Sequence, residues 1–292
     1  MPLAMHVALL TAFTMVAFAA NSILTRLAVD GGYADPMSFA VLRVLAGALV
    51  LAAMVLPRTR RIPWKDPMRA VGAASLAIYM IGFSLAYVTL DAGLGALILF
   101  GVVQITMFVH AATRGQNPTP RQIIGASIAF AGLVLVLWPA PDSVSDPIGA
   151  AAMVVAGLGW AVYTISGRNA QHPLAATAAN FCICLPPLAL VLLPFVSFVT
   201  PWGIVLALVC GGVTSGLGYA LWYRVLPRLQ QSVAAVVQLS VPIIAILTGA
   251  ALLSESVTFV VIAAALLVVF GIGLAVTSRP TPADHKPPPA PR

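Results

Sequence analysis

LDAGLGALILFGVVQITMFVHAA, residues 90–112, is a long apolar run with an acid near its start and Arg114 just beyond its end. A membrane-spanning β-strand has about ten residues and alternating polarity, whereas about 20 apolar residues cross the hydrocarbon core as a helix. We therefore predict that this stretch is a transmembrane helix with one acidic and one basic end.

Nine other apolar runs of similar length surround this one. The ten predicted spans are 7–28, 37–56, 69–88, 91–113, 120–138, 148–168, 173–197, 202–225, 231–253 and 256–277. Prolines and other turn residues mark many of the breaks between them. The chain of 292 residues is 61% hydrophobic and 8% charged, with a mean hydropathy of +1.02. Ten spans nearly exhaust that length, so we predict an all-α integral membrane protein without a soluble domain.

The connections between the spans alternate in charge. One set contains no Lys or Arg and six of the eight acids, and it comprises 29–36, 89–91, 139–147, 198–201 and 254–256. The other set, with the adjoining helix ends and the tail, carries every Lys and Arg except Arg26 and Arg43. Because basic connecting loops stay in the cytoplasm, we predict a multi-pass protein of a bacterial inner membrane with both termini cytoplasmic. The net charge of +7 reflects this bias, so no nucleic-acid partner is expected.

The chain also repeats with an offset of about 139 residues. LDAGLGALILFGVVQ aligns with LQQSVAAVVQLSVPI, and Gly132 aligns with Gly271. This pattern predicts two five-helix halves, 1–141 and 142–278, followed by a proline-rich, disordered tail over 279–292. Because five is odd, the second half enters the membrane in the opposite orientation. Such inverted repeats are typical of secondary transporters, whose substrate site lies near the midplane between the halves.

The half-repeat also resembles a known family. DPMSFAVLRVLAGALVLAAMVL (35–56), and the C-terminal run with Pro242, Gly249, Glu255 and Gly271, are similar to EamA-type transporters of the drug/metabolite transporter superfamily. The chain departs from that pattern at Val103, Gln116 and Asn180. Within the superfamily the overall look is nearest to aromatic amino acid exporters of the YddG type. The resemblance implies a ten-helix bundle around a central cavity that moves small organic solutes, mostly outward.

Polar and aromatic side chains form stripes inside several spans. At 1.5 Å per residue, Tyr79 lies about 15 Å deep, near the midplane. Polar groups facing lipid at that depth are costly, so these stripes should face inward. The predicted substrate-binding residues are Asn21, Arg43, Tyr79, Phe83, Gln104, Trp160, Tyr163, Tyr219, Trp222 and Gln238. The alternative is that they only pack and hydrogen-bond between helices.

Arg43 is the most informative single residue. It lies six positions inside its span, about 9 Å from the acidic end. It must be paired, or reach back to Asp30 or Asp35. A guanidinium at this depth could clamp a substrate carboxylate, or it could anchor neighbouring helices. For Arg26 a structural role is expected, because Asp30 stands at i+4 beside it.

Other residues could permit movement. Pro242 frees backbone carbonyls and can kink a helix, and Gly95 and Gly101 soften the fourth span. They are the predicted hinge or gating residues, although Gly and Pro are also ordinary in membrane helices.

The sequence carries no acid deep in any span, and proton relays use intramembrane carboxylates or histidines. We therefore expect export of amino acids, including aromatic ones, or of similar metabolites, by alternating access without ion coupling. The alternatives are a proton-coupled drug carrier, a nucleotide-sugar or lipid-linked carrier, and a non-transporting scaffold. HExxH and GxSxG motifs are missing, so an enzyme is not expected, nor is a metal or cofactor. The predicted partners are a small-molecule substrate and the lipid bilayer, and the protein is expected to act as a monomer.

Overall fold

The computed structural model describes residues 3–59, 63–64, 66–113, 119–137, 146–167, 170–229, 237–238 and 240–276. Within these ranges the chain is almost entirely helical. The predicted boundary between the halves near 141, and the predicted disordered tail over 279–292, lie outside the described residues.

The first half contains five helices, and their positions match the first five predicted spans. They are α1 (Leu3–Val29), α2 (Pro36–Thr59), α3 (Pro67–Ala86), α4 (Ala92–Thr113) and α5 (Pro120–Leu137).

The second half follows the same order, with one span built from three pieces. Its helices are α6 (Pro147–Gly167), α7 (Pro173–Leu192), α8 (Pro201–Leu208), η2 (Val209–Leu217), α9 (Gly218–Val225), α11 (Ser240–Leu253) and α12 (Phe259–Val276). Short 3₁₀ turns follow α7 and α9 at Leu193–Phe195 and Leu226–Arg228. The segment α8–η2–α9 is continuous, and its middle, η2, is a π-helix of nine residues. Long π-helical stretches are rare and occur mostly at functional sites.

Prolines and capping side chains set the helix starts, as the sequence predicts. Proline is the first residue of six helices, where its missing N–H costs no helical hydrogen bond. Asp35 and Asp66 stand immediately before two of them, and each accepts hydrogen bonds from backbone N–H groups of the first turn. Thr119 and Gln122 form a reciprocal capping box at the start of α5.

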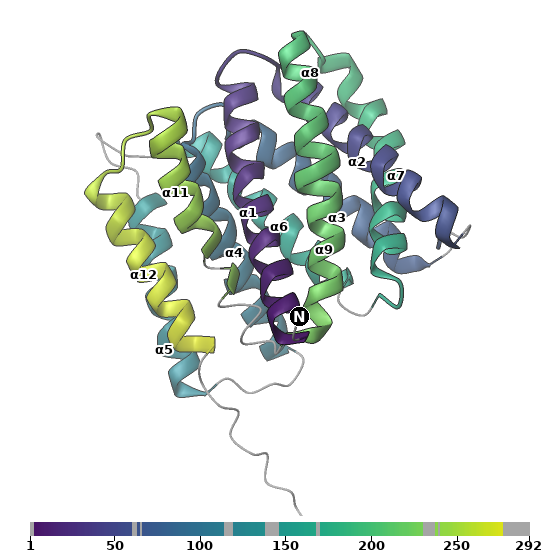
Figure 1. Ribbon diagram of the computed structural model, residues 1–292. Helices are drawn as coiled ribbons and strands as arrows, with labels where there is room; N and C mark the ends of the chain where they lie inside the picture. The colour runs from purple at the N-terminus through teal and green to yellow at the C-terminus, as the bar shows by residue number, and fades with distance from the viewer. Residues whose placement is uncertain are drawn as a thin grey trace, which may run out of the picture.

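Glycines allow the helices to approach closely. α3 packs against α6, where a Cβ at Gly159 would lie 2.8 Å from the carbonyl oxygen of Ser75. α5 and α12 pair at one edge of the bundle (Figure 1), where Gly125 and Gly271 each face the backbone of the other helix. Small residues at such contacts are the usual means of helix packing in membranes.

Among the residues that the structure describes, seven helical segments are long and apolar enough to cross a membrane. Three shorter apolar helices, Pro120–Leu135, Ser240–Leu253 and Phe259–Ala275, occupy the positions of the other predicted spans.

The bundle has two ends of different character. The turn between α1 and α2 and the turn between α11 and α12 lie at the top of Figure 1, whereas α1 begins near the bottom. We call the top the acidic end, because it gathers the described carboxylates Asp30, Asp35, Asp91, Asp146 and Glu255. The opposite end is called the basic end.

Candidate functional site

Arg43 of α2 is fully buried where helices of both halves meet. Its Nε donates to Ser215 Oγ at 2.9 Å, and its Nη2 donates to Asn21 Oδ1 at 3.1 Å. Nη2 also lies 3.2 Å from Tyr79 Oη and 3.1 Å from Tyr219 Oη. These partners come from α1, α3, η2 and α9, so one guanidinium connects α2 to four other helical segments.

The groups around Arg43 also bond to one another. Ser215 Oγ and Thr214 Oγ1 donate to Asn21 Oδ1 at 2.9 and 2.7 Å. Tyr219 Oη donates to Tyr79 Oη at 3.2 Å. We call these five residues the neutral shell, because hydroxyls and an amide carry no net charge at neutral pH.

The prediction that Arg43 is paired, or reaches Asp30 or Asp35, is wrong. Asp30 pairs with Arg26, and Asp35 caps α2. Among the described residues, no carboxylate lies within 4.0 Å of the Arg43 guanidinium, and its Nη1 is buried without a hydrogen-bond partner. The side chain turns inward because the neutral shell supplies acceptors there.

Aromatic rings surround this polar centre. The Arg43 Cζ lies 4.9 Å from the ring centroid of Phe83 and 5.5 Å from that of Tyr79, which is cation–π geometry. Trp160 packs 5.1 Å from Tyr79 and 4.6 Å from Tyr219, measured between centroids. The cation is therefore held by π faces as well as by hydrogen bonds.

A small cavity with a volume of about 10 Å³, room for roughly one water molecule, lies beside the neutral shell. Its walls are mostly aromatic and apolar: Phe18, Asn21, Ser22, Tyr79, Phe83, Leu99, Phe100, Trp160 and Tyr219. Typical small-molecule pockets enclose roughly 300–1,000 Å³, so the cavity is contracted in this conformation.

The structure thus brings together most of the predicted site residues. Asn21, Tyr79, Phe83, Trp160 and Tyr219 line the cavity, and Arg43 bonds to three of them. Two further predicted residues extend the ring cluster: Tyr163 stacks on Trp160 at 5.4 Å, and Trp222 packs against Phe18 at 5.9 Å.

Other predicted residues lie apart from this cluster. Gln104 and Gln238 are buried but are not among the residues that line the cavity. Gly95 faces the ring of Tyr87, and Gly101 faces Leu133. Pro242 lies in the first turn of α11, whose described part begins at Ser240.

Sequence reasoning missed a second buried arginine. Arg69, in the first turn of α3, pairs with Asp66 at 3.0 Å and lies 3.4 Å from Asn180 Oδ1 of α7. Because Arg69 lies at the end of a predicted span, the sequence suggests an exposed cation beside a cytoplasmic loop. The spacing Asp66-x-x-Arg69 across a helix start was the available signal, because such a pair can cap the helix and neutralise the cation.

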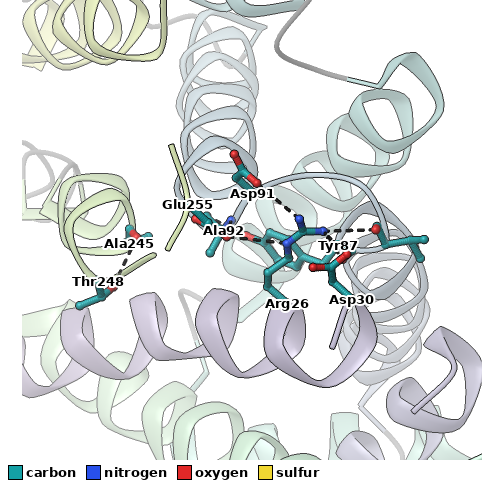
Figure 2. A network of polar contacts seen from close by, with 9 residues as sticks. Arg26, Asp30, Tyr87, Asp91, Ala92, Ala245, Thr248 and Glu255 are labelled. Carbon is teal, nitrogen blue, oxygen red and sulfur yellow. Dashed lines mark hydrogen bonds and ion pairs between the residues drawn. The ribbon is translucent and has the colours of Figure 1, made fainter. Parts of the chain in front are cut away.

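A charged cluster closes the acidic end (Figure 2). Arg26 pairs with Asp30 at 3.2 Å, with Asp91 at 3.4 Å and with Glu255 at 3.7 Å. Glu255 also accepts a hydrogen bond of 2.7 Å from the backbone N–H of Ala92. We call this cluster the latch, since it joins α1 and the start of α4 to the α11–α12 turn. The pairing of Arg26 with Asp30 is as predicted, whereas the two other carboxylates come from distant segments.

Burial governs the protonation of the latch. It raises the pKa of Asp91, opposed by Arg26 and assisted by Asp30. It also raises the pKa of Glu255, opposed by the hydrogen bond from Ala92. Three carboxylates share one guanidinium, so the latch carries excess negative charge.

A second contact at the same end joins the two halves. Asp35 Oδ2 accepts hydrogen bonds from the backbone N–H groups of Ser197 and Phe198 at 3.0 and 2.9 Å. Burial by itself would raise the pKa of Asp35, but hydrogen bonds from Ser38 and from the backbone outweigh it and lower the pKa to about 2. The backbone of Thr200 also donates to Tyr33, so the α1–α2 turn is attached to the α7–α8 turn.

Long apolar helices packed around a buried polar and aromatic centre define a multi-pass membrane protein of the transporter class. The chain belongs to the EamA-like transporter family, which matches residues 5–138 and 147–277 and thus spans both halves. The resemblance to EamA-type transporters that the sequence indicates is confirmed.

Relatives and a solved structure cover nearly the whole chain. An uncharacterized protein of Pseudomonas aeruginosa is 42% identical over 93% of this chain and 94% of its own length. An uncharacterized transporter of Archaeoglobus fulgidus is 27% identical over 85% and 91% of the two chains. A crystal structure 20% identical in sequence has a TM-score of 0.67 and covers 91% of this chain and 96% of its own, which supports the fold.

Proposed function

We propose that the protein is a secondary transporter that exports small organic metabolites across a bacterial inner membrane by alternating access. The observation that carries this proposal is the position of the neutral shell and its cavity. Asn21, Arg43 and Tyr79 come from the first family-matched segment, whereas Ser215 and Tyr219 come from the second. A site built from both halves changes its access when the halves move against each other.

The charge pattern supports an orientation. Basic connecting loops remain in the cytoplasm, so the acidic end faces the periplasm and both termini lie in the cytoplasm. The latch and the Asp35 contacts then hold the periplasmic side closed. Export requires both to release while the opposite side closes.

The helix contacts support ten spans arranged as two inverted halves. α3 of the first half packs on α6, the first helix of the second half. The counterpart of this contact is α1 packing on η2 and α9. α2 with α7, α4 with α11 and α5 with α12 each pair equivalent helices of the two halves. A pseudo-two-fold relation between the halves accounts for all of these pairs.

The site suggests the substrate. Amino acids, with aromatic ones among them, carry both a carboxylate for Arg43 and a body that suits the aromatic walls. No Asp or Glu is among the residues of the neutral shell or the cavity lining, which supports transport without ion coupling. In this scheme Gly95, Gly101 and Pro242 act as hinges, and the protein works as a monomer.

Counterflow in proteoliposomes tests this function. The native protein should exchange labelled Phe, Trp, Thr or Met, and Trp160→Ala and Tyr79→Ala should reduce the exchange. Trp202→Ala is the matched control, because Trp202 is half-exposed at the start of α8 and is not among the residues that line the cavity. If native protein gives no more exchange than empty liposomes for all four amino acids, the proposed substrate class is wrong. Equal losses in Trp202→Ala would show that the cavity is not the cause.

A further inference from the structure

The charge of Arg43 is unbalanced where it lies. The side chain is fully buried, its described partners are neutral, and Nη1 has no hydrogen-bond partner. A charge within the membrane region is costly unless it is paired or reaches water. Hydrogen bonds to hydroxyls and an amide reduce this cost but leave the net charge in place. An anion that enters beside the guanidinium would balance it.

Three donors remain for such an anion. Nη1 is one of them, although Arg43 itself is not among the residues that line the cavity, and Trp160 Nε1 in the cavity wall is another. The third is the Tyr79 hydroxyl, which accepts from Arg43 Nη2 and from Tyr219 Oη, so its own proton is left to donate. Tyr79 also lines the cavity. A guanidinium N–H and a phenol O–H together suit the two oxygens of one carboxylate.

The cavity provides no negatively charged group for a cation, and the faces of Tyr79 and Phe83 already hold the Arg43 guanidinium. Its polar lining consists of Asn21, Ser22, the two tyrosine hydroxyls and the indole N–H of Trp160, and its remaining walls are aromatic or aliphatic. A substrate ammonium would therefore be desolvated without a carboxylate and would lie near the Arg43 charge. The site offers one positive charge and no negative charge, so the substrate that matches it is a monoanion.

We propose that this site binds monocarboxylates with an aromatic or aliphatic body and no ammonium group, in preference to zwitterionic amino acids. The inference rests on the proposed transport of small organic metabolites, and among these it favours monocarboxylates over the amino acids named above. It assigns Arg43 a role in binding the ligand, as opposed to a role only in holding neighbouring helices together. Without Arg43, Ser215 and Thr214 still bond to Asn21, and Tyr219 still bonds to Tyr79. Arg43→Gln should therefore fold, with a thermal midpoint close to that of the native protein.

Three probes with the same phenyl ring test the charge preference. 3-Phenylpropionate carries only the carboxylate, L-phenylalanine carries both charges, and phenethylamine carries only the ammonium. Their affinities are measured from ligand-induced shifts of the thermal midpoint in detergent, which avoids passive permeation of the free acid. We expect 3-phenylpropionate to bind about tenfold or more tightly than phenylalanine, because the ammonium of phenylalanine would be desolvated without a partner of opposite charge. Phenethylamine should not bind.

Two variants assign the preference to the proposed donors. Arg43→Gln should weaken 3-phenylpropionate binding about 10- to 100-fold and remove its advantage over phenylalanine. Tyr79→Phe keeps the ring and should weaken it several-fold, which gives a second test if Arg43→Gln does not fold. Both changes should weaken binding of the uncharged 3-phenylpropanol much less than binding of 3-phenylpropionate, because the alcohol carries no charge to balance that of Arg43.

The outcomes separate the two levels of the proposal. Equal affinities for the three charged probes, no binding of 3-phenylpropionate at millimolar concentration, or unchanged binding in the variants would overturn the monocarboxylate site. Counterflow of phenylalanine by the native protein would then leave the transport function standing. If neither phenylalanine nor 3-phenylpropionate is transported by the native protein, the transport proposal for this site fails as well.

Discussion

The Arg26 guanidinium and the Glu255 carboxylate lie 3.7 Å apart at the acidic end, although they belong to the first and the last quarter of the chain. Glu255 bonds in turn to the first residue of α4. The contact therefore joins three segments above the buried Arg43 site. Because it spans both halves, it must break or rearrange if these segments separate at this end.

From the contacts of the latch we predict that its loss makes the buried site more accessible. Arg26→Gln leaves three carboxylates without their shared cation, so the closed conformation should lose stability relative to an open one. Cys210 reports on this opening, since its buried thiol lies 3.4 Å from Asn21 Oδ1 of the neutral shell. We expect a membrane-impermeant thiol reagent to label Cys210 about five- to thirtyfold faster, which corresponds to roughly 1–2 kcal/mol.

The labelling experiment requires a background in which Cys182 and Cys184 are replaced by Ala. Arg224→Gln is the matched control, because Arg224 is an exposed arginine in the last turn of α9. Unchanged labelling in Arg26→Gln, or an equal increase in Arg224→Gln, would show that the latch does not control access.

The latch should also respond to pH, with a definite sign. Burial in the closed conformation raises the pKa of Asp91 and of Glu255 above their ordinary values of 3.8 and 4.5. The closed conformation therefore binds protons more tightly than one in which both groups are solvated. Protonation of the two carboxyl groups stabilises the closed conformation fully at pH values below their ordinary pKa values. This stabilisation is lost as the pH rises through their raised pKa values.

This pH response can be followed by the labelling rate of Cys210 between pH 4 and pH 8, reported relative to a variant that does not titrate. The double variant Asp91→Asn, Glu255→Gln serves as that reference and removes the effect of pH on the thiol itself. The ratio of native to reference rates should rise with pH. A ratio that falls with pH would mean that protonation releases the latch.

We predict that Asp35 stabilises the folded protein in a way that is lost in acid. The pKa of Asp35 is lowered from the ordinary value of 3.8 to about 2. The ionised carboxylate therefore stabilises the folded protein fully above pH 3.8, and this stabilisation is lost as the pH falls from 3.8 through 2. A pKa shift of this size corresponds to about 2 kcal/mol in the free energy of unfolding. Asp35→Asn should therefore lower the thermal midpoint at pH 7, and the difference from native protein should vanish near pH 2. Asp30→Asn, at an exposed carboxylate of the same turn, should have a smaller effect. A difference that persists at pH 2 would show that the charge of Asp35 is not its cause.

The sequence predicts much of the fold because local rules decide it. Apolar length predicts the helices, and Pro36, Pro67, Pro147, Pro173 and Pro201 each begin one where a break is predicted. Spacing within single helices also finds the inward faces of Tyr79 and Phe83.

Contacts between distant segments are not predictable in this way. Nothing local says that Arg43 bonds to Ser215, or that Glu255 faces Arg26. The π-helical register over Val209–Leu217 is equally hidden, because no residue type in it is specific for five-residue hydrogen bonding. Electrostatic expectation favoured a carboxylate partner for Arg43, whereas packing surrounds it with neutral acceptors.

The α3–α6 contact gives a prediction about packing. A Cβ at Gly159 would lie 2.8 Å from Ser75 O and 2.9 Å from Tyr79 N, and both atoms belong to the backbone, which cannot move as a side chain can. Overpacking against backbone atoms should cost about 2–3 kcal/mol, the upper part of the usual range. The gain in helix propensity of about 1 kcal/mol offsets part of it, so Gly159→Ala should lower the free energy of unfolding by about 1–2 kcal/mol. It should also displace Tyr79 from the neutral shell and weaken ligand binding. Leu158→Ala, one position away at a side chain that is 45% exposed, is the control and should change neither property. Thermal unfolding in detergent measures the first effect, and a midpoint in Gly159→Ala equal to or above the native one would contradict the close backbone contact.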